Sequence, residues 1–161
     1  MEHTSSGVIR MQLTRKETEL LKDLKEQEKL CAEKYTKHAA CAKDSQLKDL
    51  FTQIAQVERG HLDTLTQMEN GETASQPMAG GQPQSAPQES YSASDSADKQ
   101  ADSYLCTDLL ASEKHTSHGY DVSVFEFRDE TARDTLNHIQ KEEQEHGKMI
   151  YDYMEKNHMY S

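Results

Sequence analysis

An internal repeat constrains the fold of this 161-residue chain more than any other feature of its sequence. Residues 20–61 align without a gap with residues 105–146, at an offset of 85, and eleven of the 42 aligned positions are identical. The identities include a Glu–x–x–His motif that occurs once in each copy. Self-similarity on this scale is typical of a duplicated supersecondary unit. The sequence therefore predicts two copies of one structural unit.

Each copy carries apolar residues at the spacings of 3, 4 and 7 that predict amphipathic helices. In each copy a break in the pattern precedes the second stripe, and Asp44 and Asp129 stand where a helix N-cap is expected. Each unit is therefore predicted to be a helical hairpin, the first over residues 12–69 and the second over residues 102–158.

The segment between the hairpins, residues 70–101, contains all three prolines and almost no apolar residues. A stretch of this composition buries too little surface to offset its ordering entropy, which favours a flexible linker. A linker of this length also allows the second and third helices to run parallel. We expect one all-α domain over residues 1–161, a four-helix bundle whose two hairpins are joined by a long crossover.

Six repeated polar residues are candidates for a metal centre. Each hairpin supplies one Glu from its first helix, and a Glu and a His three residues apart from its second helix. Residues at that spacing share a helix face, so a pseudo-two-fold axis would bring all six to the bundle centre. The candidate ligands are Glu28, Glu58, His61, Glu113, Glu143 and His146.

Charge and donor type suggest which metals suit this set. Four carboxylates carry a charge of about −4, which two divalent ions would neutralise. Oxygen donors with one imidazole per metal favour iron or manganese, whereas zinc more often recruits sulfur or additional histidine. We expect two iron or manganese ions per chain; a relic site with one metal or none, and a metal-free helical adaptor, are the alternatives.

Two repeated tyrosines, Tyr35 and Tyr120, lie two helical turns beyond Glu28 and Glu113. They are interpreted either as residues that hydrogen-bond a ligating carboxylate and fix its orientation or as amphipathic core residues. Cys31 is expected to fill the core. The histidines outside the two motifs show no paired spacing and are expected to be exposed.

The composition restricts the partners and the cellular location. The formal net charge is −11, from 29 acidic and 18 basic residues, which argues against nucleic-acid binding. The sequence has neither a run of about 18 apolar residues, as a membrane span requires, nor an apolar N-terminal stretch, as a secretory signal requires. Three cysteines without a CxxC pair suggest a reducing compartment, and we expect a cytoplasmic protein.

These motifs resemble known proteins. Four helices, two Glu–x–x–His motifs and a long crossover are similar to the ferritin-like superfamily, nearest in ligand pattern to its rubrerythrin and bacterioferritin branches. The segments "DLLASEK", "EEQEH" and "YDYMEKNHMY" resemble, more narrowly, the spore coat protein F family. The resemblance covers residues 20–69 and 103–160.

The resemblance implies a ferritin-like di-iron bundle from an endospore-forming bacterium, with possible deposition in the spore coat. One hypothesis is a redox-active centre, an oxidase or peroxidase, that reacts with oxygen or peroxide. The chain departs from rubrerythrins in having no CxxC pairs and in carrying Thr116 in place of an additional Glu. The other hypothesis is a structural coat protein in which the metal is stabilising or vestigial, with coat proteins or a second copy of the chain as partners.

Overall fold

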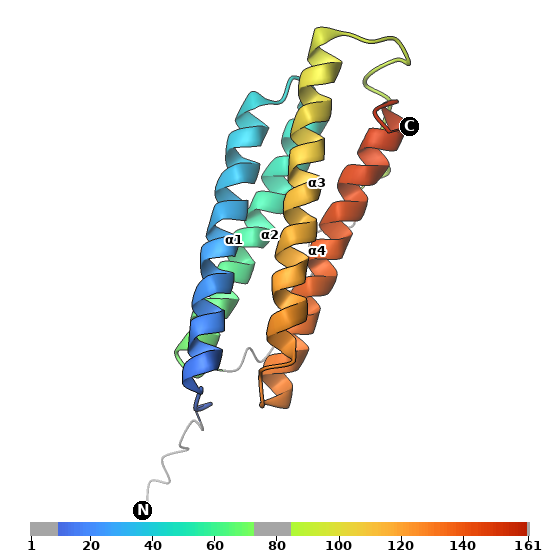
Figure 1. Ribbon diagram of the computed structural model, residues 1–161. Helices are drawn as coiled ribbons and strands as arrows, with labels where there is room; N and C mark the ends of the chain where they lie inside the picture. The colour runs from blue at the N-terminus through green and yellow to red at the C-terminus, as the bar shows by residue number, and fades with distance from the viewer. Residues whose placement is uncertain (1–9, 73–84, 161) are drawn as a thin grey trace, which may run out of the picture.

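The computed structural model describes residues 10–72 and 85–160, which form four α-helices and no β-strand. The helices are α1 (Arg15–Cys41), α2 (Ser45–Glu69), α3 (Ala97–Val124) and α4 (Glu130–Lys156) (Figure 1). The predicted all-α fold of two helical hairpins is therefore confirmed. None of these helices has an apolar stretch long enough to cross a membrane.

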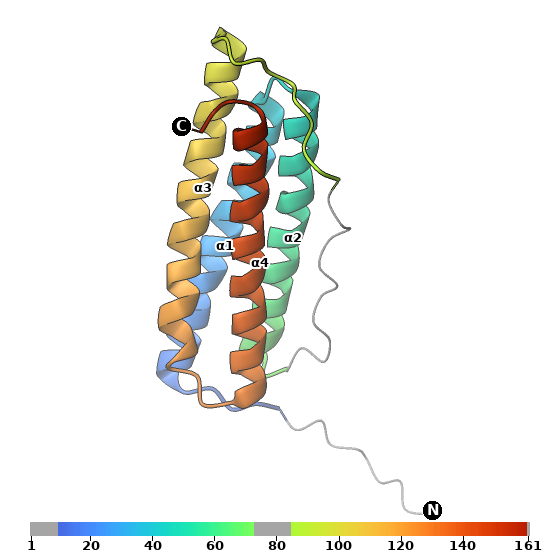
Figure 2. The same ribbon diagram turned by 90° about the vertical axis from the view of Figure 1, so that its right-hand side faces the viewer.

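The helices form an elongated bundle in which each helix is antiparallel to both of its packing neighbours. α1 packs against α2 and α3, and α4 packs against α3 and α2 (Figures 1 and 2). α2 ends at the end of the bundle opposite to the start of α3, so these two helices run in the same direction. The parallel pair is the arrangement that the length of the linker had suggested.

Side-chain caps set where the helices begin. Asp44 accepts a hydrogen bond from the backbone of Gln46, and Asp129 accepts one from Ala132, as expected for N-caps. Ser96 caps α3 by accepting from the backbone of Lys99. Because of this cap α3 begins at Ala97, so residues 97–101 of the expected linker are helical.

The described end of the crossover, residues 85–96, contacts the ends of α2 and α4. The amide nitrogens of Ser90 and Tyr91 donate to Asn157 Oδ1 at 2.6 and 2.9 Å. The side chain of Gln46 exchanges hydrogen bonds with the backbone of Gln88 at 2.7 and 3.0 Å. These contacts fix residues 88–91, whereas residues 73–84 of the predicted linker lie outside the described residues.

Apolar side chains form two clusters, one toward each end of the bundle. Tyr35, Phe51 and Ile150 belong to the cluster nearer the α1–α2 loop, and Tyr120, Leu136 and Leu65 belong to the other. These are equivalent positions of the repeat at the offset of 85, so the pseudo-symmetry exchanges the clusters. The charged residues of the six-member set lie between them.

The pseudo-two-fold axis passes between α1 and α3 at one identifiable contact. Cys31 Sγ and Thr116 Oγ1 lie 3.2 Å apart, and the two residues are themselves equivalent positions of the repeat. Two equivalent residues can touch only where the axis runs between them. This contact is one turn beyond Glu28 and Glu113, so the axis also passes through the polar layer.

Candidate metal centre

The structure brings all six candidate ligands together at mid-bundle. Each helix contributes to the group, as the repeat had predicted. The least buried of the six side chains retains only 3% of its accessible surface. The group comprises Glu28 on α1, Glu58 and His61 on α2, Glu113 on α3, and Glu143 and His146 on α4.

The six residues form two interlocking sets within the described part of the chain. One contains Glu28 and His61 and the other contains Glu113 and His146, while Glu58 and Glu143 belong to both. Within each set, one donor atom per residue lies within 4.8 Å of the donor atoms of the others. Each set therefore offers three carboxylates and one imidazole to a single point.

The two shared carboxylates lie between the histidines. Glu58 places Oε1 3.0 Å from His146 Nδ1 and Oε2 3.3 Å from His61 Nδ1. Glu143 does the reverse, with Oε1 3.0 Å from His61 Nδ1 and Oε2 3.7 Å from His146 Nδ1. The imidazole rings stack with their centroids 6.0 Å apart. Each shared carboxylate thus offers one oxygen to each set, which is the geometry of a bridging ligand.

Buried oxygens without a hydrogen-bond partner test whether the centre suits a cation. In residues 10–72 and 85–160, such atoms within the centre are Glu28 Oε2, Glu113 Oε2 and both carboxylate oxygens of Glu143, of which Oε1 has only the ion-pair contact with His61 Nδ1. An unpaired buried carboxylate oxygen is costly, and a hard divalent cation is the partner that offsets the cost. Both the donor set and these oxygens fit two oxygen-preferring metal ions.

The two tyrosines join the hairpins at the centre. Tyr35 on α1 donates to Glu113 Oε1 at 2.5 Å, and Tyr120 on α3 donates to Glu28 Oε1. Both side chains are fully buried and also belong to the apolar clusters, so each combines the two interpretations left open by the sequence. Each tyrosine contacts the glutamate of the opposite hairpin, which fixes the orientation of that carboxylate.

The carboxylates of the centre differ in acidity. Burial, together with the charge of Glu28, raises the pKa of Glu58 to about 8. Burial and the charges of Glu28 and Glu113 raise the pKa of Glu143 well above its usual range. Burial alone would also raise the pKa of Glu28, yet the neighbouring Glu58 and His61 lower it to about 2. The two shared carboxylates, Glu58 and Glu143, therefore hold protons when no cation is bound.

The two histidines are strong bases in this environment. Burial opposes their protonation, but the surrounding carboxylates raise the pKa of both His61 and His146 well above the usual value. With Glu58 and Glu143 neutral, the charges of the two imidazolium groups balance those of Glu28 and Glu113. The metal-free centre is thus neutralised by protons where a loaded centre would be neutralised by metal.

Sequence reasoning missed Glu142, which has no counterpart in the first hairpin. Its Oε1 lies 3.3 Å from His61 Nε2 and 3.0 Å from His138 Nε2. The equivalent residue is Val57, so only His61 has this outer carboxylate. A contact of this kind orients a metal-ligating histidine and raises its basicity. The spacing of four residues between His138 and Glu142 was the available signal.

Two of the histidines expected to be exposed are paired instead. His138 is half-buried beside Glu142, and His38 Nε2 lies 2.7 Å from Asp108 Oδ2. For these two residues the expectation was wrong: the partner of His38 lies on another helix, α3, and the partner of His138 lies one turn further along the same helix. His115, His118 and His158 are exposed, and His3 lies outside the described residues.

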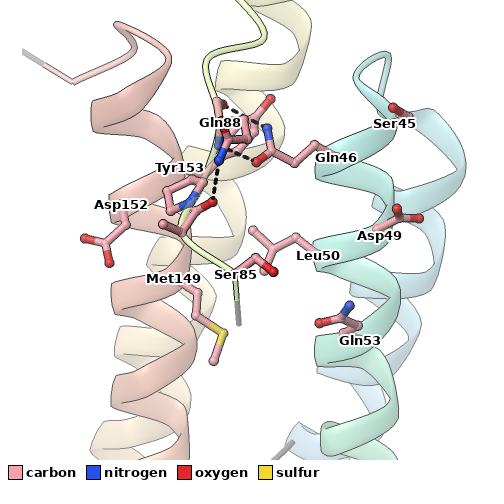
Figure 3. Close-up of a pocket in the computed structure, with 12 residues that line it drawn as sticks. Ser45, Gln46, Asp49, Leu50, Gln53, Ser85, Gln88, Met149, Asp152 and Tyr153 are labelled. Carbon is pink, nitrogen blue, oxygen red and sulfur yellow. Dashed lines mark hydrogen bonds between the residues drawn. The ribbon is translucent and has the colours of Figure 1, made fainter. Parts of the chain in front are cut away.

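A separate cleft of about 740 Å³ lies between α2, α4 and residues 85–88. Figure 3 shows Asp49 and Gln53 on one side and Met149 and Asp152 on the other, with the Gln46–Gln88 hydrogen bonds above. Its lining contains none of the six candidate ligands. The buried charged centre, and not this cleft, carries the features of a chemical site.

Comparison with known protein families gives a match to the second hairpin. Residues 101–161 match the family model described as the Coat F domain. No similar curated protein and no similar solved structure was found. The matched segment contains three of the six candidate ligands, Glu113, Glu143 and His146. The predicted resemblance of this chain to the spore coat protein F family is therefore confirmed, over its second hairpin.

Proposed function

We propose that this chain is a di-metal carboxylate protein that binds two iron or manganese ions at mid-bundle and reacts with oxygen or hydrogen peroxide. The observation that carries the proposal is the pair of interlocking ligand sets, which share Glu58 and Glu143. Such a set of four carboxylates and two histidines, supplied by four helices, is the ligand pattern of di-iron and di-manganese bundles.

The residues of the centre would have different roles in holding the ions. Glu58 and Glu143 would be shared between the two ions, while Glu28 with His61 and Glu113 with His146 would complete the two subsites. Tyr35 and Tyr120 would keep the terminal carboxylates oriented, and the apolar clusters cover the centre toward both ends of the bundle. Bound iron or manganese would supply redox chemistry and coordination positions open to a small oxidant.

The first test is the metal content of the purified chain after anaerobic loading, measured by elemental analysis. We expect two ions per chain in the wild type and almost none in the Glu58→Gln, Glu143→Gln double variant. The control is the Asp63→Asn, Glu145→Gln double variant, which removes the same two charges from exposed positions on the same helices. A wild type that cannot be loaded would contradict the proposal.

Reactivity is tested separately from binding. The loaded chain should consume oxygen or peroxide at a rate proportional to its metal content, followed with an oxygen electrode or by peroxide titration. A fully loaded chain that leaves both oxidants unchanged would remove the redox part of the proposal and leave the metal centre in place.

The Coat F match supports a second candidate, a structural role in the spore coat. In that role the bridging carboxylates would hold the hairpins together through the metal, without turnover. Chelation should then lower the melting temperature while neither oxidant is consumed, and the protein should fractionate with the coat of spores from its host. A melting temperature that changes with neither chelator nor added metal would count against this role.

A further inference from the structure

We infer that divalent metal ions reach the centre through a cleft between α3 and α4, and that Gly147 keeps this cleft open. The inference rests on the proposed metal centre and adds its route of access. Two surface depressions, one on α3 and α4 and one on α1 and α2, are equivalent in the internal repeat but differ in what lines them.

The α3–α4 cleft has a volume of about 500 Å³ and extends inward to two candidate ligands. Its lining includes Glu113 and Glu143, two residues that retain only 3% and 1% of their accessible surface. Gly147 on α4 and Ser117 on α3 form part of its walls. The cleft therefore extends from the surface to two residues of the centre, Glu113 and Glu143, whose unpaired carboxylate oxygens are themselves buried.

The corresponding depression between α1 and α2 has a volume of about 390 Å³. Its lining includes Ala32 and Leu62, which are the repeat equivalents of Ser117 and Gly147. The carboxylates Glu28 and Glu58 are not part of this lining. The two hairpins thus have equivalent depressions, of which the one on α3 and α4 reaches the centre.

Two differences between the hairpins account for this asymmetry. Leu62 places a branched side chain where α4 has only the hydrogen of Gly147. Arg59 Nη2 donates to Thr36 Oγ1 at 2.8 Å and so ties α2 to α1 across the first depression. On α4, by contrast, a Cβ added to Gly147 would lie 3.5 Å from Leu110 Cδ1, an ordinary contact that leaves the rest of the cleft open.

The base of the α3–α4 cleft is suited to cations. Glu113 Oε2 and both carboxylate oxygens of Glu143 are buried without hydrogen-bond partners. The α3 wall carries both signs of charge at exposed positions, Asp121 and Lys114. A cation that passes the Asp121 carboxylate on the wall therefore finds further oxygens without a hydrogen bond at the base of the cleft.

The test is the rate at which the full-length, metal-free chain takes up Co²⁺, followed by the visible absorption of the bound ion after rapid mixing. Gly147→Leu gives the second hairpin the residue that the first has at Leu62, and leucine has a higher helix propensity than glycine. Ser117→Leu narrows the cleft from the opposite wall. Gly147→Ala adds only the Cβ, and Asn137→Leu adds a leucine at an exposed position of α4 outside the cleft.

We expect Gly147→Leu and Ser117→Leu to slow uptake by about tenfold or more, which corresponds to ~1.4 kcal/mol of added barrier. Gly147→Ala and Asn137→Leu should load nearly as fast as the wild type, and every variant should finish with two ions per chain. Equal rates in all variants would overturn the route while the metal centre stands. A wild type that takes up no Co²⁺, Mn²⁺ or Fe²⁺ would overturn both.

Discussion

The phenolic oxygen of Tyr35 lies 2.5 Å from a carboxylate oxygen of Glu113, a residue of the opposite hairpin. The repeat supplies the reciprocal contact, from Tyr120 to Glu28. Each hairpin therefore orients a candidate ligand of its partner. The consequence is that the two halves depend on each other for the geometry of the centre and not only for apolar packing.

Replacing Tyr35 by Phe should weaken both the fold and the metal centre. Loss of a hydrogen bond to a buried charged group costs about 2 kcal/mol, and loss of ligand support lowers metal affinity about 10- to 100-fold. The matched control is Tyr153→Phe, which loses a 2.6 Å hydrogen bond to Asp44 away from the centre. Denaturant unfolding should show a lower free energy of unfolding in both variants, whereas calorimetry should show weaker metal binding in Tyr35→Phe alone.

Replacing Glu142 by Val, the residue that the first hairpin has at position 57, should make the two subsites more alike. The affinity of the subsite that contains His61 should fall about 10- to 100-fold, because that histidine loses its outer carboxylate. The subsite of His146 should change little. Two-phase metal titration would resolve the subsites, with Glu145→Val as the exposed control on α4. Equal weakening of both phases, or of neither, would contradict this role for Glu142.

The metal-free fold should lose stability as the pH rises. Glu58 has a pKa of about 8 in the fold against an ordinary value of 4.5, so between these values the folded chain holds a proton that the unfolded chain has released. Such a group costs up to ~1.4 kcal/mol of unfolding free energy per pH unit. The raised pKa values of His61 and His146 act in the same direction, since their stabilisation is complete below the unfolded value of 6.5 and is lost at higher pH.

The lowered pKa of Glu28 acts in the opposite direction, but only below its ordinary value of 4.5. Thermal melting of the metal-free chain should therefore give a higher midpoint at pH 5.5 than at pH 8.5. Glu58→Gln should flatten this dependence, because the substituted side chain cannot titrate. A metal-free wild type that is equally stable at both pH values would show that the centre is not protonated as described.

Metal binding near neutral pH should release about four protons per chain. Two come from Glu58 and Glu143, and two come from His61 and His146, because all four groups must lose a proton to act as ligands. Calorimetric titration in buffers of different ionisation enthalpy measures this number. Release of no protons would mean that the empty centre is already ionised.

The repeat made much of this structure predictable. Glu28 and Glu113, with the two Glu–x–x–His motifs, identified a central group because residues that recur in register must occupy equivalent places. Asp44 and Asp129 could be assigned as caps because an N-cap is a local interaction. These inferences required only helical geometry and the offset between the copies.

Other features were hidden because they break the repeat or depend on packing between helices. Glu142 was missed because its counterpart is Val57, and comparison of the copies favours residues that agree. The partners of Tyr35 and His38 lie on α3, and spacing within a helix does not say which neighbour its side chains meet. The start of α3 at Ala97 was obscured because its cap, Ser96, stands in a segment rich in serine.

The contact between Cys31 and Thr116 has a consequence for how freely the sequence can change. At most positions of a duplicated chain, a residue can be substituted in one copy independently of the other copy, because each residue has its own surroundings. On the axis the surroundings of one copy are the other copy, so a larger residue at 31 takes its space from 116. We therefore expect substitutions at these two positions to be tolerated jointly, as pairs of matched volume, and poorly one at a time.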